Sequence, residues 1–205
     1  SNLLFPISKV IQFLLKLKII KSRKFKEIKS ICIGNIYLGG TGKTSLAIEL
    51  KEIFDKMNIR SCFIKKKYSD QIDEQNLLKR HGKTFIEKKR IKALENAILE
   101  NYQVAIFDDG LQDKSIAYDI SFICFNQKNL VGNGRLIPAG PLRESLDSLK
   151  ENTNIFLIGN SENNLDFKNN LLKRFSNLNF FDCIYEPLNF ENFDKSYNYI
   201  VFSGI

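Results

Sequence analysis

Short apolar runs recur along the chain and are separated by longer segments of mixed polarity. Runs that are apolar throughout are typical of strands that are buried on both faces of a parallel sheet. The pattern predicts strands at 30–34, 60–65, 103–107, 119–125, 154–158, 181–185 and 198–203.

The segments between these runs carry apolar residues at the spacing of a helix face and predict helices at 43–57, 74–81, 88–101, 142–151 and 165–176. Strands that alternate with helices indicate an α/β fold, with a mostly parallel sheet and helices on both faces. The helix at 74–81 ends at His81 and Gly82, where a glycine suits the left-handed position and a cation suits the C-terminal dipole. We therefore interpret His81, the single histidine, as structural.

The first 28 residues differ, because lysine and arginine are interleaved there with leucine, isoleucine and phenylalanine. Lys9, Lys16 and Lys18 interrupt the apolar residues too often for a transmembrane helix, which needs ~20 apolar residues in succession. Residues 1–28 are predicted to form a basic amphipathic helix on an anionic membrane surface. The alternative is an ordinary helix packed on the domain with a solvated lysine face. Binding to nucleic acid is not expected, since no nucleic-acid motif accompanies the charge.

With 205 residues and 43% hydrophobic content, the chain is long enough to bury a substantial core. The first 100 residues carry 22 Lys and Arg against 10 Asp and Glu, whereas the remainder carries 9 against 13. The four cysteines lie in apolar runs without a C-x-x-C pair, which favours reduced core residues of a cytosolic protein. We expect no cleavable signal peptide, because the chain does not begin with the charge and apolar pattern of one.

A glycine-rich segment follows the apolar run at 31–33, and its residues are Gly39, Gly40, Thr41, Gly42, Lys43 and Thr44. Glycines here let backbone N–H groups converge on an anion, and the following helix points its positive dipole end at the same place. Lys43 is expected to reach the terminal phosphates of a nucleoside triphosphate, and the Thr44 hydroxyl to bind Mg²⁺. The usual motif begins with glycine where this chain has Tyr37. A turn that only joins a strand to a helix is the alternative.

Two carboxylates, Asp108 and Asp109, follow the buried run at 103–107. Ligands of open α/β sheets bind at the carboxyl ends of the strands, so Asp108 is expected beside Thr44 and the metal. Asp109 is expected to be a second metal ligand or to orient water. The alternative is a polar turn that closes the strand and has no part in metal binding.

The stretch from Gly132 to Glu144 is long and rich in glycine and proline, which is typical of a functional loop. Pro141 is expected in the first turn of the helix that follows. Arg135 and Arg143 are candidates for stabilising charge on a transferring phosphoryl group or for holding an anionic substrate.

Three stretches, in this order and spacing, resemble the tetraacyldisaccharide 4′-kinase family of lipid A biosynthesis. They are G-N-x-x-x-G-G-T-G-K-T from Gly34 to Thr44, D-D-G-L-Q from Asp108 to Gln112, and G-N-G-R-L-x-P-A-G-P-L-R-E from Gly132 to Glu144. The resemblance extends over nearly the whole chain. It implies phosphoryl transfer from ATP, with Mg²⁺, to the 4′-hydroxyl of an acylated glucosamine disaccharide 1-phosphate at the cytoplasmic face of the bacterial inner membrane.

The resemblance also implies a catalytic base. The family's G-D-E-P motif aligns with residues 72–75, which places the base at Asp73. A carboxylate there can orient a sugar hydroxyl and accept its proton, although Asp73 is equally suited to cap a helix that begins at Glu74. The family's S/T-R-G-Y-G stretch reads K-K-K-Y-S at residues 65–69, and the family's histidine partner of the base has no counterpart here, since His81 does not match its position.

These expectations divide the chain into three parts. Residues 1–28 are the membrane-associating helix, residues 29–190 the phosphate-loop kinase domain, and residues 191–205 the start of a C-terminal region that the chain carries only in part. Two other functions stay open at this point. One is a nucleotide-binding relative without turnover, and the other is an unrelated basic phosphate-loop NTPase.

Overall fold

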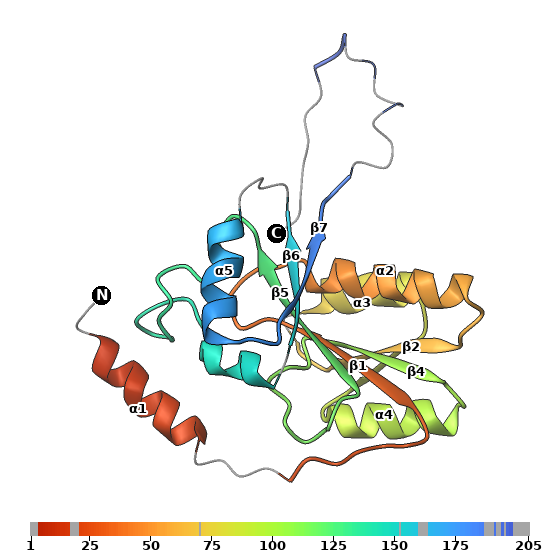
Figure 1. Ribbon diagram of the computed structural model, residues 1–205. Helices are drawn as coiled ribbons and strands as arrows, with labels where there is room; N and C mark the ends of the chain where they lie inside the picture. The colour runs from red at the N-terminus through yellow and green to blue at the C-terminus, as the bar shows by residue number, and fades with distance from the viewer. Residues whose placement is uncertain are drawn as a thin grey trace.

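The computed structural model describes residues 4–16, 21–69, 71–151, 153–159, 164–186, 191, 194 and 196–198. Its seven strands form one sheet in the order β3-β2-β4-β1-β5-β6-β7 (Figure 1). They are β1 (Lys29–Gly34), β2 (Ser61–Lys66), β3 (Thr84–Glu87), β4 (Val104–Asp108), β5 (Ile120–Asn126), β6 (Asn154–Ile158) and β7 (Asn179–Cys183). Every neighbouring pair is parallel, which confirms the predicted sheet.

Helices cover both faces of this sheet (Figure 1). They are α2 (Lys43–Lys56), α3 (Ile72–His81), α4 (Arg90–Leu99) and α5 (Leu165–Arg174). Successive residues of a strand point to opposite faces. On β2, Phe63 packs with the buried residues of α2 and α3, while its neighbours Cys62 and Ile64 pack with those of α4. Leu171 of α5 packs in the cluster that contains Phe125 of β5.

Most predicted elements are present, but β3 was missed and β7 begins two residues before the predicted strand. β3 is a four-residue edge strand in which only Phe85 is buried, so it lacks the continuous apolar run of an inner strand. Most of the strand predicted at 198–203 lies outside the described residues.

The helix predicted at 142–151 is wrong. The segment is a loop followed by the short 3-10 helix η2 (Leu146–Lys150), and Pro141 is not in a helical turn. Backbone pairing to the segment after β1 keeps residues 141–143 out of a helix, because the Arg143 N–H donates to the Ile36 carbonyl at 2.7 Å. The helical turn starts only after Ser145, whose hydroxyl caps it by accepting from the Asp147 N–H.

Two expectations at α3 are also wrong. Gly82 has φ 164°, which is extended rather than left-handed, although its N–H still donates to the Leu78 carbonyl. Helix α3 begins at Ile72, so Asp73 lies inside its first turn and does not cap it. His81 ends the helix, and its Nδ1 lies 3.8 Å from Glu52 of α2.

The N-terminal helix α1 (Phe5–Lys16) is shorter than predicted. At residues 21–28 the chain runs along the domain instead, where Phe25 and Ile28 are buried in the cluster that contains α4. The Arg23 N–H donates to the Ser115 carbonyl at 2.9 Å, which holds this segment against the residues before β5. No helix in the described part of the chain has both the length and the apolar character needed to cross a membrane.

The end of β1 and the turn after β4 approach each other closely at Gly34. A Cβ atom added there would lie 2.5 Å from the Cβ of Leu111. This approach brings the carboxyl ends of two central strands together and positions the polar residues that follow each of them.

Replacement of Gly34 by alanine is therefore expected to destabilise the fold by about 1–3 kcal/mol, because the neighbouring backbone has to move. Urea unfolding followed by circular dichroism measures this free energy. Gly40→Ala is the matched control, since nothing lies within 4 Å of a Cβ at that position. Equal unfolding midpoints for the two variants would contradict the close approach.

Candidate phosphate-binding site

The glycine-rich segment forms the loop between β1 and α2 at the carboxyl edge of the sheet. Gly42 precedes the first helical residue with φ 77°, a left-handed conformation that favours glycine. Gly42 has no side chain that could cap the helix, so the first backbone N–H groups of α2 face the loop without a capping side chain. Unpaired N–H groups together with the helix dipole provide a binding place for an anion.

Asn35 holds this loop in shape from inside. Its side chain is fully buried, and its Nδ2 donates to the Gly39 carbonyl at 3.2 Å and to the Thr41 hydroxyl at 2.9 Å. The backbone carbonyl of Asn35 accepts from the Gln112 side chain at 3.0 Å, so Asn35 also joins the loop to the turn after β4. The sequence motifs included Asn35 and Gln112, but their contacts were not predicted.

Asp108 ends β4 and is fully buried, with one of its carboxylate oxygens engaged. Oδ2 accepts from the Thr44 hydroxyl at 3.3 Å and from Lys65 Nζ at 2.6 Å. Oδ1 is buried without a hydrogen-bond partner. The structure therefore places Asp108 beside Thr44, as predicted.

These oxygens fit Mg²⁺, which commonly takes one or two protein carboxylates and completes its shell with phosphate oxygens and water. Thr44 and the unpaired oxygen of Asp108 are the groups that would hold it. Across the described residues, there is no group of three or more His, Cys, Asp or Glu side chains that could hold a metal ion.

No role was predicted from the sequence for Lys65, which also belongs to this cluster. Its side chain is 1% exposed, and its ammonium group forms ion pairs with both Asp108 and Glu74. Burial alone would lower the pKa of Lys65, but the charges and hydrogen bonds of the two carboxylates outweigh it and raise the pKa. Lys65 is therefore a charged side chain inside the domain.

Asp109 is surrounded by cations from two sides. Arg143 donates to both of its carboxylate oxygens, at 2.7 and 3.3 Å, and Lys43 Nζ lies 3.9 Å away. Burial would raise the pKa of Asp109, but the hydrogen bond from Arg143 and the nearby positive charges outweigh it and lower the pKa. The side chain is thus an anion engaged with protein cations.

Arg143 arrives at the site because its loop pairs with the segment before the phosphate loop. The Leu38 N–H donates to the Pro141 carbonyl at 2.8 Å, and Tyr37 forms an antiparallel bridge with Leu142. The guanidinium also donates to the Asn35 side-chain oxygen and, at 3.0 Å, to the Asn35 carbonyl. One arginine therefore joins the phosphate loop, the turn after β4 and the glycine- and proline-rich loop.

Arg90, at the start of α4, was not found from the sequence. Its side chain is buried, and Nη2 donates to the Asp109 carbonyl at 2.5 Å. Asp109 has φ 55°, a conformation that is uncommon for residues other than glycine. Arg90 therefore supports a turn whose backbone is unusual.

The other predicted residues lie around this centre. Asp73 is exposed in the first turn of α3, directly before Glu74, whose carboxylate contacts Lys65. Arg135 does not join the cluster of Arg143, because its guanidinium stacks over the ring of Phe5 in α1, 5.3 Å from the ring centroid. The site therefore contains one of the two predicted arginines.

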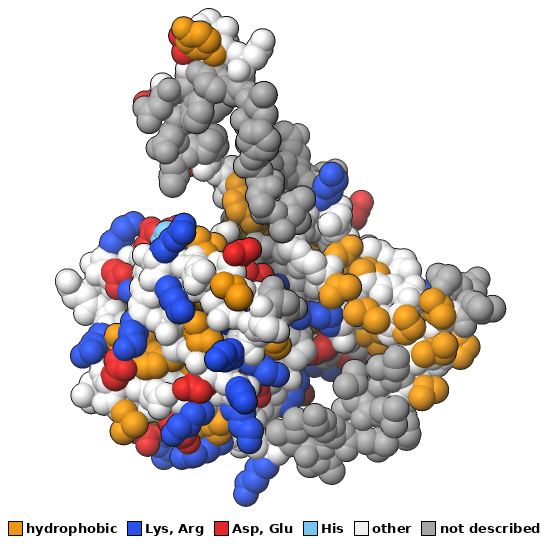
Figure 2. Space-filling view, turned by 180° about the vertical axis from the view of Figure 1, so that it is seen from behind, with side chains coloured by type: hydrophobic (Ala, Val, Ile, Leu, Met, Phe, Trp, Pro, Cys, Tyr) orange, Lys and Arg blue, Asp and Glu red, His pale blue; other side chains and the backbone are white. Residues whose placement is uncertain are grey.

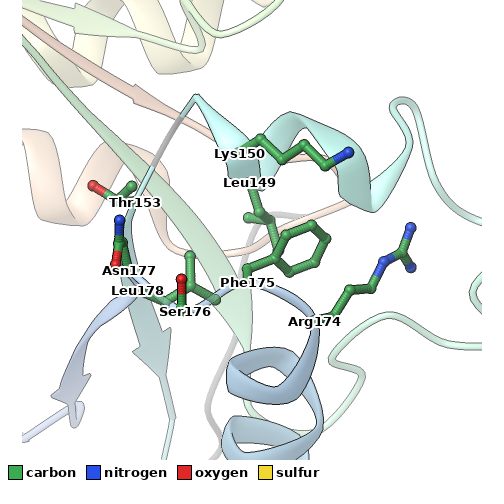
Figure 3. A pocket seen from close by; sticks show the side chains of 8 residues that line it. All are labelled: Leu149, Lys150, Thr153, Arg174, Phe175, Ser176, Asn177 and Leu178. Carbon is green, nitrogen blue, oxygen red and sulfur yellow. The ribbon is translucent and has the colours of Figure 1, made fainter.

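A separate pocket lies between η2 and the end of α5 (Figure 3). It is lined by residues such as Leu149, Thr153, Phe175 and Leu178. Thr153 and Leu178 directly precede β6 and β7, so this pocket lies at the amino ends of the strands. The phosphate loop is at the opposite edge, where ligands of open α/β sheets bind.

Comparison with known proteins gives one consistent result. The family model described as Tetraacyldisaccharide-1-P 4′-kinase matches residues 1–198. A tetraacyldisaccharide 4′-kinase of Pelagibacter ubique is 52% identical over 205 residues, covering 100% of this chain and 65% of its own. One of Rickettsia bellii is 32% identical over 229 residues, covering 100% of this chain and 68% of its own. The chain thus spans about two thirds of the length of these curated relatives.

Among solved structures, the "apo" form of LpxK from Aquifex aeolicus in complex with ATP is similar, with a TM-score of 0.61. The match covers 90% of this chain and 79% of that chain at 19% sequence identity. At this identity the likeness shows a shared fold.

Replacement of Asn35 by alanine is expected to weaken binding of inorganic tripolyphosphate at least about tenfold, which corresponds to about 1.4 kcal/mol of lost loop preorganisation. Isothermal titration calorimetry measures the dissociation constant. Asn76→Ala, at an exposed position of α3, is the control and should bind as the native chain does. An unchanged dissociation constant for Asn35→Ala would contradict the role of this side chain.

Proposed function

Because the chain belongs to the tetraacyldisaccharide-1-P 4′-kinase family, we propose that it transfers the terminal phosphoryl group of ATP to the 4′-hydroxyl of an acylated glucosamine disaccharide 1-phosphate. The observation that carries this proposal is the convergence of Lys43, Thr44, Asp108 and Arg143 at the open start of α2. A phosphate chain placed there meets N–H groups, two cations and a pair of oxygens suited to Mg²⁺.

Transfer of a phosphoryl group requires charge stabilisation and positioning more than covalent help. Lys43 and Arg143 provide positive charge beside the loop, and Asp109 keeps both side chains directed there. When bound, Mg²⁺ neutralises phosphate charge, and Thr44 and Asp108 would hold it. Asp73 orients the sugar hydroxyl for attack and accepts its proton.

An acylated substrate stays in the lipid bilayer, so the enzyme has to work at the membrane surface. Apolar side chains of α1 are exposed, with Phe5 at 42%, Ile7 at 50% and Val10 at 59%. Figure 2 shows hydrophobic side chains gathered on the side where α1 lies, while charged side chains spread over the opposite side. We assign α1 to contact with the anionic cytoplasmic face of the inner membrane, where apolar side chains enter the acyl boundary.

The loop that carries Arg143 also contacts α1. Ser8 is buried, and its hydroxyl donates to the Leu136 carbonyl at 3.0 Å and accepts from the Ala139 N–H at 3.2 Å. These bonds hold α1 beside the loop from Gly132 to Glu144. A substrate held in the membrane under α1 is thereby brought toward the phosphate site.

Two variants separate nucleotide binding from transfer. Lys43→Ala is expected to lower the transfer rate at least about 10²-fold, because one stabilising charge is lost. Asp73→Asn is expected to lose transfer and to keep its affinity for ATP. Transfer from radiolabelled ATP to the acylated disaccharide 1-phosphate and calorimetry with ATP measure the two quantities in the full chain as the organism expresses it. Transfer at the native rate by Lys43→Ala would overturn the proposed function.

The membrane assignment predicts that the double variant Ile7→Ser/Val10→Ser binds anionic vesicles at least about tenfold more weakly, because two apolar side chains no longer enter the bilayer. Cosedimentation with phosphatidylglycerol vesicles measures binding. Leu99→Ser on α4 is the control, since Leu99 is 78% exposed and lies outside α1. Equal binding by the two variants would refute a membrane role for α1.

A further inference from the structure

The need to neutralise the charge of Lys65 does not by itself explain why its ammonium group contacts two carboxylates. Its ammonium group lies inside the domain and contacts carboxylates from two elements, Asp108 at the end of β4 and Glu74 in the first turn of α3. A buried ammonium group requires an opposite charge nearby, and Asp108 already provides one that is equally buried. The contact with Glu74 is therefore not needed to neutralise Lys65.

Glu74 differs from Asp108 in its surroundings. Its side chain is 51% exposed, so water can solvate it without help from Lys65. Because water screens this carboxylate, its ion pair contributes less to stability than the fully buried pair of Lys65 with Asp108. What the contact does provide is a fixed connection between the start of α3 and the carboxylate beside the phosphate loop.

Among the described residues, few other contacts of this kind hold the start of α3. No side chain of Gln71, the residue before the helix, caps its N–H groups, and Ile72 and Asp73 are exposed. The first buried side chain is Gln75, whose Nε2 donates to the Tyr68 carbonyl at 2.7 Å. The position of the first turn relative to the sheet thus depends on a small number of polar contacts, and the one from Glu74 leads directly to Asp108.

We propose that Lys65 is a positioning residue, which holds the first turn of α3 against Asp108 through Glu74 and thereby fixes Asp73 relative to the phosphate groups. The inference rests on the proposed function, in which Asp73 takes the proton of the sugar hydroxyl. A displacement of about 1 Å at a reacting group can lower a rate about 10²-fold, so a link of this kind affects transfer more than binding.

The test compares Glu74→Gln, Lys65→Met and the double variant in the full chain as the organism expresses it. Glu74→Gln removes one carboxylate at a half-exposed position, so folding should persist, with a melting temperature within about 2 °C of the native value. We expect its kcat to fall about tenfold or more while the dissociation constant for ATP stays unchanged. Amide exchange of Gln75, whose N–H donates to the Gln71 carbonyl at 3.2 Å, should become faster, which reports on the first turn without any catalytic assay.

The double variant tests whether both residues act through one link. Lys65→Met should lose at least as much kcat as Glu74→Gln, and the double variant should lose no more than Lys65→Met, because groups that act as a unit are not additive. Lys79→Met, at an exposed position of the same helix, is the matched control and should behave as the native chain.

Three results would overturn the inference. The first is native kcat together with native amide exchange for Glu74→Gln. The second is a loss of kcat in the double variant that equals the sum of the two single losses. The third is a parallel loss of ATP affinity and melting temperature in Glu74→Gln, which would indicate a general structural role. Failure of the proposed function is recognised separately. In that case Asp73→Asn transfers phosphate at the native rate, whatever the variants of Lys65 and Glu74 do.

Discussion

The site is organised by the need to compensate a carboxylate buried at the end of a central strand. Asp108 has no access to water, so its charge depends on donors that the fold supplies. The donors are Lys65 from β2 and Thr44 from α2, and both use the same oxygen. Three elements are thereby fixed relative to one another, and the second oxygen is buried without a hydrogen-bond partner. Removal of one partner would leave an uncompensated charge, which costs far more than the pair contributes.

A second set of contacts extends this arrangement to distant parts of the chain. Asp109 follows Asp108 in an unusual backbone conformation and is held by Arg143 through its carboxylate and by Arg90 through its carbonyl. Arg143 also binds Asn35, which shapes the phosphate loop. The planar guanidinium serves several acceptors at once, which the single ammonium group of a lysine cannot reproduce. The loop, the turn and the start of the helix are therefore parts of one polar network.

The sequence predicted the components that depend on local pattern. Glycines before Lys43 and an apolar run before Asp108 are local signals, and the parallel order of strands then places Thr44 and Asp108 together. Lys65 could not be found in this way, because it belongs to a run of three lysines and its burial depends on elements that are distant in the sequence, such as β4 with Asp108. The paired segment at 141–143 was missed for a similar reason, since backbone pairing with residues 36–38 overrides the local preference for a helix.

That pairing divides the long loop into two parts with different freedom to change in length. Residues 136–142 pair with each other, and residues 141–143 pair with the segment before the phosphate loop, so one added residue would shift the side chain of Arg143. Lys128 and Asn129, which precede the motif that begins at Gly132, are exposed. Insertions and deletions between relatives should therefore collect at these two residues, since exposed loop tips tolerate them best. A peptide tag or spectroscopic label introduced there would leave the register of the paired segment intact.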